Sequence, residues 1–374
     1  RAGSRGGDTE PMSGSATMRR VSPSKKDYGY SNARVRGMRS RLLKQAFIDD
    51  LIDSKDVGAI ITSLMETEYA PDLEERLLHG RSAGQIDLAL KDNMVRTFRK
   101  VLSLINDESL DLLGALLGRW DLFNIKTVIR GRHMNLAPEE IVESMIAVAQ
   151  ISQIDLDELA RQQSVKGVVD TLSTWKLPFA VPLRAAMPEY IESGNLAVLE
   201  LALDKYYTEW AAKRLKGRGV NQRLARRFLG TQIDTIDLLT CLRLLNADLG
   251  DQDALRFFLP GGTYVSEALF RDLTSMSDVD EVYDRLKRTP YGRPVEDVAI
   301  KYIESGSISV FERALEDFLM RRAFAAGQGD PLGVGIIISY LWMKANEITN
   351  LRILVKGVSV GMPVSRMREE LIVV

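Results

Sequence analysis

Cysteine and histidine are almost missing from this chain of 374 residues, which contains one cysteine, Cys241, and two histidines, His79 and His133. A single thiol excludes an internal disulfide framework and any metal cluster held by several cysteines, and it suits a reducing compartment. Cys241 occupies an apolar position between Leu238 and Leu242 and is expected to be a core residue. We therefore expect neither a cofactor nor a metal site.

Long hydrophobic runs are missing as well. The longest, Leu332–Met343, has twelve residues that include two glycines and a serine, and it is too short to cross a bilayer. Any membrane role is therefore expected to be peripheral. The 50 Lys and Arg nearly balance the 51 Asp and Glu, so the net charge of −1 gives no electrostatic reason to bind nucleic acid. The charge is uneven, however, because residues 1–45 carry +8 and the remainder −9.

What the sequence has in abundance is helical periodicity. Residues 1–26 are rich in glycine, serine and charge, and we expect this segment to be disordered because it has almost no apolar residues to bury. From about residue 27 onward, apolar residues recur at spacings of three and four. A clear example is the set Leu196, Leu199, Leu203 and Tyr206. The sequence therefore predicts an all-α fold.

A few residues indicate where helices start and stop. Asp330-Pro331 is typical of a capping residue followed by proline at the first helical position. Gly131 and Gly357 are expected to end helices. Strand patterns are scarce, and the best candidate, Val358–Val360, is short.

An internal repeat organises the chain. Three segments share one pattern, an amide or carboxylate followed by an apolar stripe and a basic residue, and they start 113 residues apart at Asn124, Asp237 and Asn350. Two further blocks, beginning at Tyr190 and at Ile48, recur in the same order at similar offsets. The pattern predicts three similar helical units over residues 27–148, 149–261 and 262–374. The periodicity leaves open whether they close around an axis or form an open solenoid.

Two other classes of function fit part of the sequence. Asp49, Asp50 and Asp53 form the D-D-x-x-D pattern with which all-α isoprenoid synthases hold magnesium against a diphosphate. A second acidic cluster, Asp280–Asp284, lies 231 residues away, too far for facing helices of one bundle, and the repeat favours a solvated strip. An α-helical repeat scaffold would also explain three units, although common solenoid repeats have only about 20–50 residues.

Five stretches form a recognisable series, and they are Tyr28–Arg36, Leu112–Gly131, Phe257–Gly262, Asp330–Gly335 and Gly361–Glu370. Together with the threefold repeat, the series resembles the C subunit of the bacterial and archaeal V-type/A-type ATPases, the counterpart of the d subunit of the eukaryotic enzyme. The resemblance covers roughly residues 27–374.

The resemblance implies a fold and a role. Three helical lobes related by a pseudo-threefold axis would form a funnel-shaped socket. Such a protein is a non-catalytic part of the central stalk, or rotor, and transmits torque for ATP-coupled proton or sodium transport. It would lie peripherally on the cytoplasmic face of the membrane, in a membrane-bound complex, with the central axle subunits and the membrane proteolipid (c) ring as partners.

Basic residues are the candidates for contact with partners. Arg34 and Arg36 belong to an N-terminal basic run that forms either a solvated face or a contact with acidic partner loops or anionic lipid headgroups. Arg130, Arg243 and Lys356 close the repeated segment in its three copies. Pseudo-threefold symmetry would bring these three cations to equivalent positions facing the socket and the acidic residues of the axle. The alternative is that they only stabilise helix C-termini.

Overall fold

The structure, a computed structural model, describes residues 28–373 except residues 55, 106 and 246–250. Every regular element within these residues is an α-helix, so the prediction of an all-α fold is confirmed. Residues 1–26, which we predicted to be disordered, lie outside the described residues.

The helices that follow α1 (Gly29–Arg39) form three consecutive series with similar lengths. The first series is α2 (Gln45–Ile52), α3 (Val57–Leu64), α4 (Ala70–Leu77), α5 (Ala83–Leu102), α6 (Asp107–His133) and α7 (Pro138–Glu143). The second is α8 (Gln153–Ala160), α9 (Val165–Thr174), α10 (Ala180–Ser193), α11 (Ala197–Arg214), α12 (Val220–Leu244) and α13 (Asp251–Leu255). The third is α14 (Glu267–Thr274), α15 (Val279–Leu286), α16 (Gly292–Ser305), α17 (Ser309–Ala326), α18 (Gly335–Ser359) and α19 (Val364–Glu370).

Short polar side chains start helices at corresponding places in the three series. Asp56, Ser164 and Asp278 are the N-caps of α3, α9 and α15, and each accepts a hydrogen bond from the backbone N–H three residues further on. These bonds satisfy one of the amide groups that a helix start leaves without a partner. Gly194 and Gly306 end α10 and α16 with φ values of +67° and +63°, a conformation that glycine adopts without a steric penalty.

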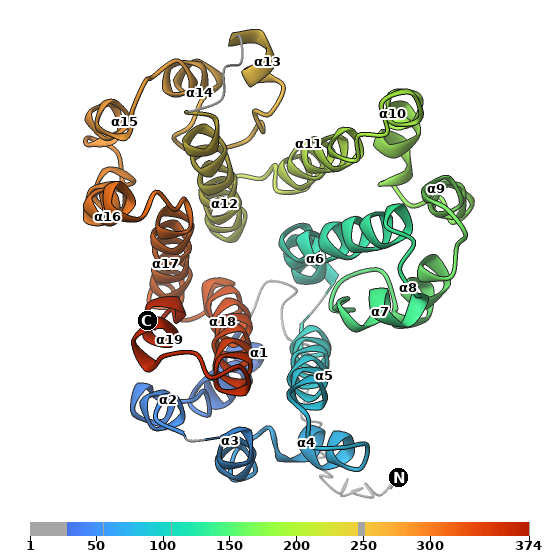
Figure 1. Ribbon diagram of the computed structural model, residues 1–374, viewed down its shortest axis with the longest axis vertical. Coiled ribbons are helices and arrows are strands. Elements are labelled where there is room, and N and C mark those ends of the chain that lie inside the picture. Colours follow the sequence, from blue (N-terminus) through green and yellow to red (C-terminus); the bar gives the residue numbers. More distant parts are fainter. Residues whose placement is uncertain (1–27, 55, 106, 246–250, 374) are drawn as a thin grey trace, which may run out of the picture.

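The long helices pair across the series. Each packs against the fourth helix of another series: α6 against α11, α12 against α17, and α18 against α5. The last of these pairs joins the C-terminal part of the chain to its N-terminal part. In Figure 1, viewed down the shortest axis, the long helices stand around a common centre and the shorter helices lie outside them.

Four aromatic rings connect α5, α6, α18 and α12. Phe98 of α5, Trp120 of α6, Trp342 of α18 and Phe228 of α12 form a chain in which consecutive ring centroids are 5.3, 5.4 and 4.8 Å apart. The three contacts among these four rings are edge-to-face, the arrangement that the ring quadrupoles favour. The rings are at most 8% exposed, so the helices meet in a dry aromatic contact.

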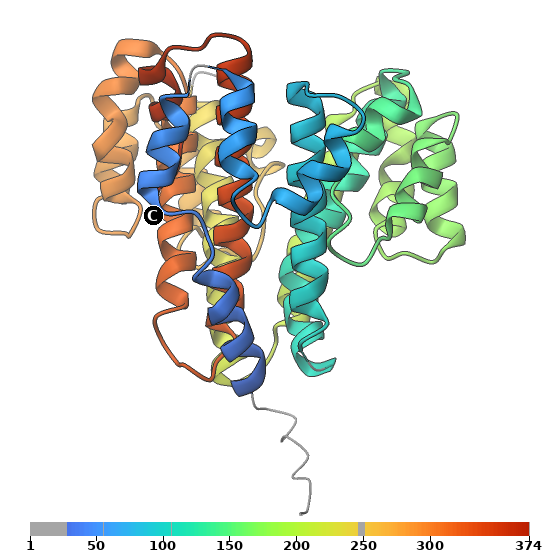
Figure 2. The same cartoon turned by 90° about the horizontal axis from the view of Figure 1, so that it is seen from below.

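The two ends of the molecule differ. Figure 2 shows the short helices beside one half of the long helices, while the long helices continue beyond them at the other end, together with α1. We call this the α1 end; it comprises α1, the starts of α6, α12 and α18, and the connections that precede those starts. The short-helix end contains the C-terminal ends of α6, α12 and α18. In the part of the chain that the structure describes, no helix is long and apolar enough to span a membrane.

Several predicted helix boundaries were wrong by a few residues. α18 begins at Gly335 and not at Pro331, because Asp330 Oδ1 accepts a hydrogen bond from the N–H of Leu332 (2.9 Å) and forms a turn before the helix. α6 continues two residues past Gly131. α18 likewise runs through Gly357 to Ser359, so the candidate strand at 358–360 is the end of a helix.

Candidate functional site

α1 is fixed to the ends of the long helices by buried polar side chains. Ser31 Oγ donates a hydrogen bond to the carbonyl of Leu104 (2.5 Å), in the connection from α5 to α6. Asn32 Nδ2 donates to the carbonyls of Pro331 and Gly333 (3.0 Å each), in the connection from α17 to α18. Two stretches that carry the family resemblance, residues 28–36 and 330–335, are therefore in direct contact.

The start of α12 joins the same assembly. Asn221 Oδ1 accepts a hydrogen bond from the N–H of Val334 (3.0 Å), which ties the second series to the α17–α18 connection. Gly335 allows the end of α17 to approach the start of α18, since a Cβ at this position would lie 2.2 Å from the carbonyl oxygen of Ala326. The α1 end is thus one connected surface to which all three series contribute.

This surface is strongly basic. Seven of its basic side chains are exposed and make no ion pair with any residue that the structure describes: Arg34, Arg36, Lys216, Arg218, Arg223, Arg226 and Arg227. Tyr30, Val220 and Leu332 lie on the same elements and are 69%, 61% and 59% exposed. Uncompensated cations interspersed with exposed apolar groups are typical of a contact with an anionic, partly apolar partner.

Arg130 and Arg243 lie at the short-helix end, each bridging a helix pair. Arg130 near the end of α6 binds Glu200 of α11 through two bonds, Nε–Oε1 at 2.6 Å and Nη2–Oε2 at 2.5 Å. The hydrogen bond to Glu200 raises the pKa of Arg130. Arg243 near the end of α12 pairs with Glu312 of α17 through one bond, from Nη2 to Oε1. Both arginine side chains remain about half exposed, at 50% and 55%.

Lys356 differs from the other two cations. The acidic side chain on its facing helix, Asp87 of α5, is bound by Arg352, one turn earlier on α18. Lys356 makes no ion pair with any described residue, and it lines an open cavity of about 620 Å³ with Asp87, Arg352 and Glu370. The predicted interface residues therefore occupy two places: Arg34 and Arg36 at the α1 end, and Arg130, Arg243 and Lys356 at the opposite end.

The acidic motif of the synthase alternative is engaged in ion pairs. Arg368 of α19 binds Asp49 at 2.7 Å and Asp53 at 3.7 Å, and its hydrogen bond lowers the pKa of Asp49. Asp284, in the second acidic cluster, pairs with Lys287. Among the residues that the structure describes, no group of three or more potential ligands could hold a metal ion. Cys241 is buried, as predicted.

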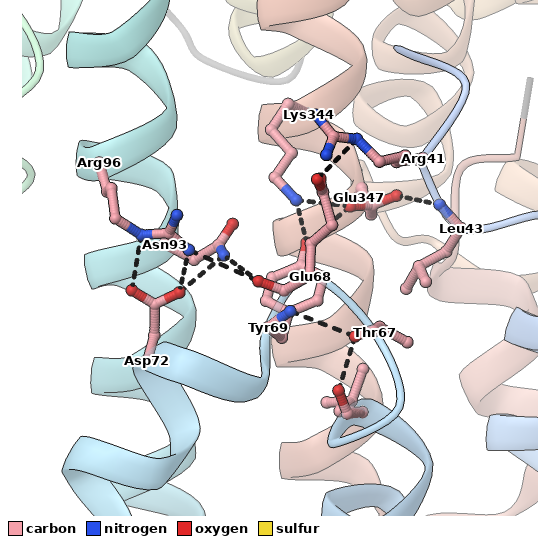
Figure 3. A network of polar contacts seen from close by, with 11 residues as sticks. Arg41, Leu43, Thr67, Glu68, Tyr69, Asp72, Asn93, Arg96, Lys344 and Glu347 are labelled. Atoms are coloured by element: carbon pink, nitrogen blue, oxygen red, sulfur yellow. Dashed lines mark hydrogen bonds and ion pairs between the residues drawn. The ribbon is translucent and has the colours of Figure 1, made fainter. Parts of the chain in front are cut away.

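A buried polar network holds the N-terminal part of the chain to α18, and it is drawn in Figure 3. Glu347 accepts hydrogen bonds from the N–H of Leu43 (2.5 Å) and from the hydroxyl of Tyr69 (2.6 Å), and Lys344 Nζ lies 2.9 Å from the same carboxylate. Lys344 and Glu347 are only 2% and 7% exposed. Burial, followed by the charge of Glu347, raises the pKa of Tyr69, so the phenol stays neutral and donates.

Sequence reasoning missed the residues that organise these junctions. Asp121, Asp234 and Glu347 are buried carboxylates at intervals of 113 residues, three positions before the repeated amide or carboxylate. Each accepts a hydrogen bond from the backbone of a neighbouring connection. The repeat offset was the signal that could have revealed them, since an acidic residue recurs there in all three copies.

Comparison with known proteins identifies the family. The sequence profile of the ATP synthase (C/AC39) subunit family matches residues 31–370, nearly the whole chain. The chain belongs to this family. The resemblance to the C subunit of the V-type/A-type enzymes is thereby confirmed.

Relatives of this ATP synthase component are found in archaea and bacteria. The C subunit of the A-type ATP synthase of Methanobrevibacter smithii is 30% identical over 347 residues, covering 91% of this chain and 87% of that protein. The protein of the same name in Methanocaldococcus jannaschii is 28% identical and covers 88% of this chain and 82% of its own length. The C subunit of the V-type ATP synthase of Deinococcus radiodurans is 28% identical, and the match covers 92% of this chain and 91% of that protein.

Proposed function

We propose that this chain is a non-catalytic rotor subunit of a rotary V/A-type ATPase, which seats the central axle on the membrane proteolipid ring and transmits torque for ATP-coupled proton or sodium transport. Membership of the ATP synthase (C/AC39) subunit family carries the proposal. In this role the chain forms a funnel-shaped socket from three units related by a pseudo-threefold axis, at 27–148, 149–261 and 262–374. The pairing of α18 with α5, which repeats that of α6 with α11, supports closure around an axis.

Stiffness supports a mechanical role. An adaptor between a shaft and a ring must pass torque without bending, and contacts between its units therefore have to be rigid. The edge-to-face contacts among Trp120, Trp342 and Phe228 join α6, α18 and α12 in a dry core. The buried ion pair of Lys344 with Glu347 adds a polar contact that only one geometry satisfies.

The charge of the α1 end supports an orientation. The cytoplasmic leaflet of a membrane carries negative surface potential, which attracts clusters of Lys and Arg. We assign the α1 end, with Arg34 and Arg36, to the membrane side, where it meets the proteolipid ring and anionic lipid headgroups on the cytoplasmic face. The opposite end, with Arg130, Arg243 and Lys356, is then the side that receives the axle.

Two binding measurements on the purified chain test this assignment. The first is its affinity for the isolated axle subunits, where submicromolar binding is expected and absence of binding would contradict the socket role. The second is sedimentation with proteolipid rings in vesicles that contain anionic lipid. The variant R218Q/R223Q/R227Q is expected to lose ring and vesicle binding and to keep axle binding.

A matched control removes the same charge elsewhere. Arg81, Arg184 and Arg288 are exposed, make no ion pair with a described residue, and lie on or beside the short outer helices. The variant R81Q/R184Q/R288Q is expected to bind vesicles as the unchanged chain does. Equal losses in both variants would show that net charge, rather than the α1 end, drives the association.

A further inference from the structure

At the repeated amide position, an asparagine side chain binds both the N–H and the carbonyl of one backbone residue in a neighbouring segment. In the middle of α6, Asn124 forms a pair of hydrogen bonds with Ile146, 22 residues later: Oδ1 accepts from the N–H and Nδ2 donates to the carbonyl, both at 2.8 Å. Asn350 of α18 forms the same pair with Ile372, at 3.1 and 2.7 Å. Both side chains are buried, so each amide acts as a latch for the connection that passes over its helix.

α12 carries an aspartate where the other two helices carry asparagine. Asp237 is fully buried, and its Oδ1 accepts a hydrogen bond from the N–H of Leu259 at 3.0 Å, again 22 residues later. Its other oxygen, Oδ2, takes the place of the donating Nδ2, and it is buried without a hydrogen-bond partner. A carboxylate cannot donate to a carbonyl, so an ionised Asp237 would leave half of the latch unmade.

The charges around Asp237 do not favour ionisation. Among the described residues, the charge that acts on Asp237 is that of Asp234, one turn earlier on α12. A negative Asp234 disfavours a second negative charge on Asp237. From the elements packed on α12, the hydroxyl of Tyr291 binds Asp234, and Glu312 binds Arg243. Cys241, one turn further along, has a pKa raised by burial and stays a neutral thiol.

The two neighbouring carboxyl groups also differ in what they bind. Asp234 accepts hydrogen bonds from the N–H groups of Tyr264 and Val265 and from the hydroxyl of Tyr291, an arrangement that can stabilise a negative charge. Asp237 accepts one bond and has one free oxygen. If the pair retains a single proton, that proton is therefore held by Asp237.

We propose that Asp237 is protonated in the folded chain and that its carboxyl O–H donates to the carbonyl of Leu259, so that this aspartic acid acts as a proton-dependent latch for residues 256–266. The proton comes from solvent, and no covalent bond changes. Deprotonation leaves Oδ2 unpaired beside Asp234 and releases the connection between α13 and α14 from α12.

The direction of the pH dependence follows from linkage. Burial, together with Asp234, raises the pKa of Asp237 to about 8, well above the value of an unfolded aspartate. A raised carboxyl pKa means that the folded chain binds the proton more tightly, so its stabilising effect is present at low pH and is lost as the pH rises. The loss runs from roughly pH 4 up to pH 8 and then levels off.

The test compares variants at the three equivalent positions. Asp237→Asn supplies a permanent donor, so the ratio of its unfolding equilibrium constant to that of the unchanged chain should fall by about tenfold per pH unit between pH 5 and 7 and level off above pH 8. Asn350→Asp is the matched control, because it should introduce the same pH dependence at the α18 latch. Urea unfolding of the full chain at several pH values gives both ratios.

A spectroscopic readout separates the latch from a general packing effect. The infrared difference between the unchanged chain and Asp237→Asn should contain the carbonyl band of a protonated carboxylic acid at pH 6, and this band should disappear above pH 9. The protection factors of residues 256–266 against hydrogen exchange, which already correct for the faster intrinsic exchange at high pH, should fall over the same interval in the unchanged chain only. A pH-independent stability ratio, or a missing carboxylic-acid band at pH 6, would overturn the proposal.

Discussion

The junction around α18 and the junction around α6 use equivalent positions in different ways. In α6, Asp121 accepts hydrogen bonds from the backbone N–H groups of Gln150 and Ile151, at 3.0 Å each. In α18, Glu347 at the equivalent position accepts one backbone bond, from Leu43, and is also bound by the side chains of Tyr69 and the buried Lys344. The position of Lys344 corresponds to Gly118 in α6, where a Cβ would lie 2.9 Å from the ring of Trp210.

The difference follows from chain connectivity. The residues that Asp121 binds, Gln150 and Ile151, are only 29 and 30 residues further along the chain, just after the short helix α7. Glu347 binds Leu43 and Tyr69, which are about 300 residues away along the chain. A contact between such distant segments carries a larger loop-closure entropy, and the α18 junction has the stronger polar contacts to offset it.

The largest expected effect comes from removing one partner of the buried pair. Glu347→Gln leaves the Lys344 ammonium without its counter-charge in a site that excludes water. We expect the free energy of unfolding to fall by about 3–5 kcal/mol. The double variant Lys344→Met/Glu347→Gln should recover most of this loss in urea unfolding. Equal losses in the single and double variants would show that the ion pair is not the origin of the effect.

The α6 junction should show its own pH dependence. Burial raises the pKa of Asp121 to about 6, against the opposing bonds from Ile151 and Gln150. Because the folded chain retains this proton more tightly, stability should fall between roughly pH 4 and pH 6, by about 2–3 kcal/mol in total. In Asp121→Asn, the difference between the free energies of unfolding at pH 4.5 and pH 7 should shrink by the contribution of Asp121. An unchanged pH difference in that variant would rule out Asp121 as the source.

Removing a single hydroxyl should have a smaller effect. Tyr69 and Tyr291 are the N-cap residues of α4 and α16 and bind the carboxylates of Glu347 and Asp234, whereas α10 has Phe179 at that position. Tyr69→Phe and Tyr291→Phe should each reduce the free energy of unfolding by about 1.5–3 kcal/mol, the value of a hydrogen bond to a charged group. Thermal melts of both variants would check this, and a neutral Tyr69→Phe would contradict the role of the network.

The half-exposed cations should contribute least to stability. Arg130→Gln breaks a bidentate pair with Glu200 that is open to solvent, so a loss of only about 0.5 kcal/mol is expected. The triple variant Arg130→Gln/Arg243→Gln/Lys356→Gln also tests the axle contact. If these cations face the axle, its affinity and the salt dependence of that affinity should fall. If axle affinity is unchanged while the free energy of unfolding falls, these cations only stabilise the packing of the helices and do not contact the axle.

Part of this structure could be predicted because it is periodic. The 113-residue offset located Asn124, Asp237 and Asn350, which lie at equivalent places on α6, α12 and α18. Local capping chemistry does not always fix a helix start, as Asp330 demonstrates, since its side chain forms a turn before α18 begins at Gly335. The buried pair Lys344–Glu347 was missed because charges three residues apart are typical of a solvated helix face. In the folded chain it is covered by the distant segment around Leu43 and Tyr69.

The packing of α18 against α5 has a consequence for the order in which this chain can fold during synthesis. α2 to α5 are made well before α18, the helix against which α3 and α5 pack. α8, α9 and α11, in contrast, are made soon after α6, the helix against which they pack. Apolar residues of α5 such as Phe98, which contacts Trp120 and is fully buried in the finished molecule, therefore remain incompletely covered until residue 359 has left the ribosome. The N-terminal helices are then the segment of the nascent chain most in need of protection from aggregation.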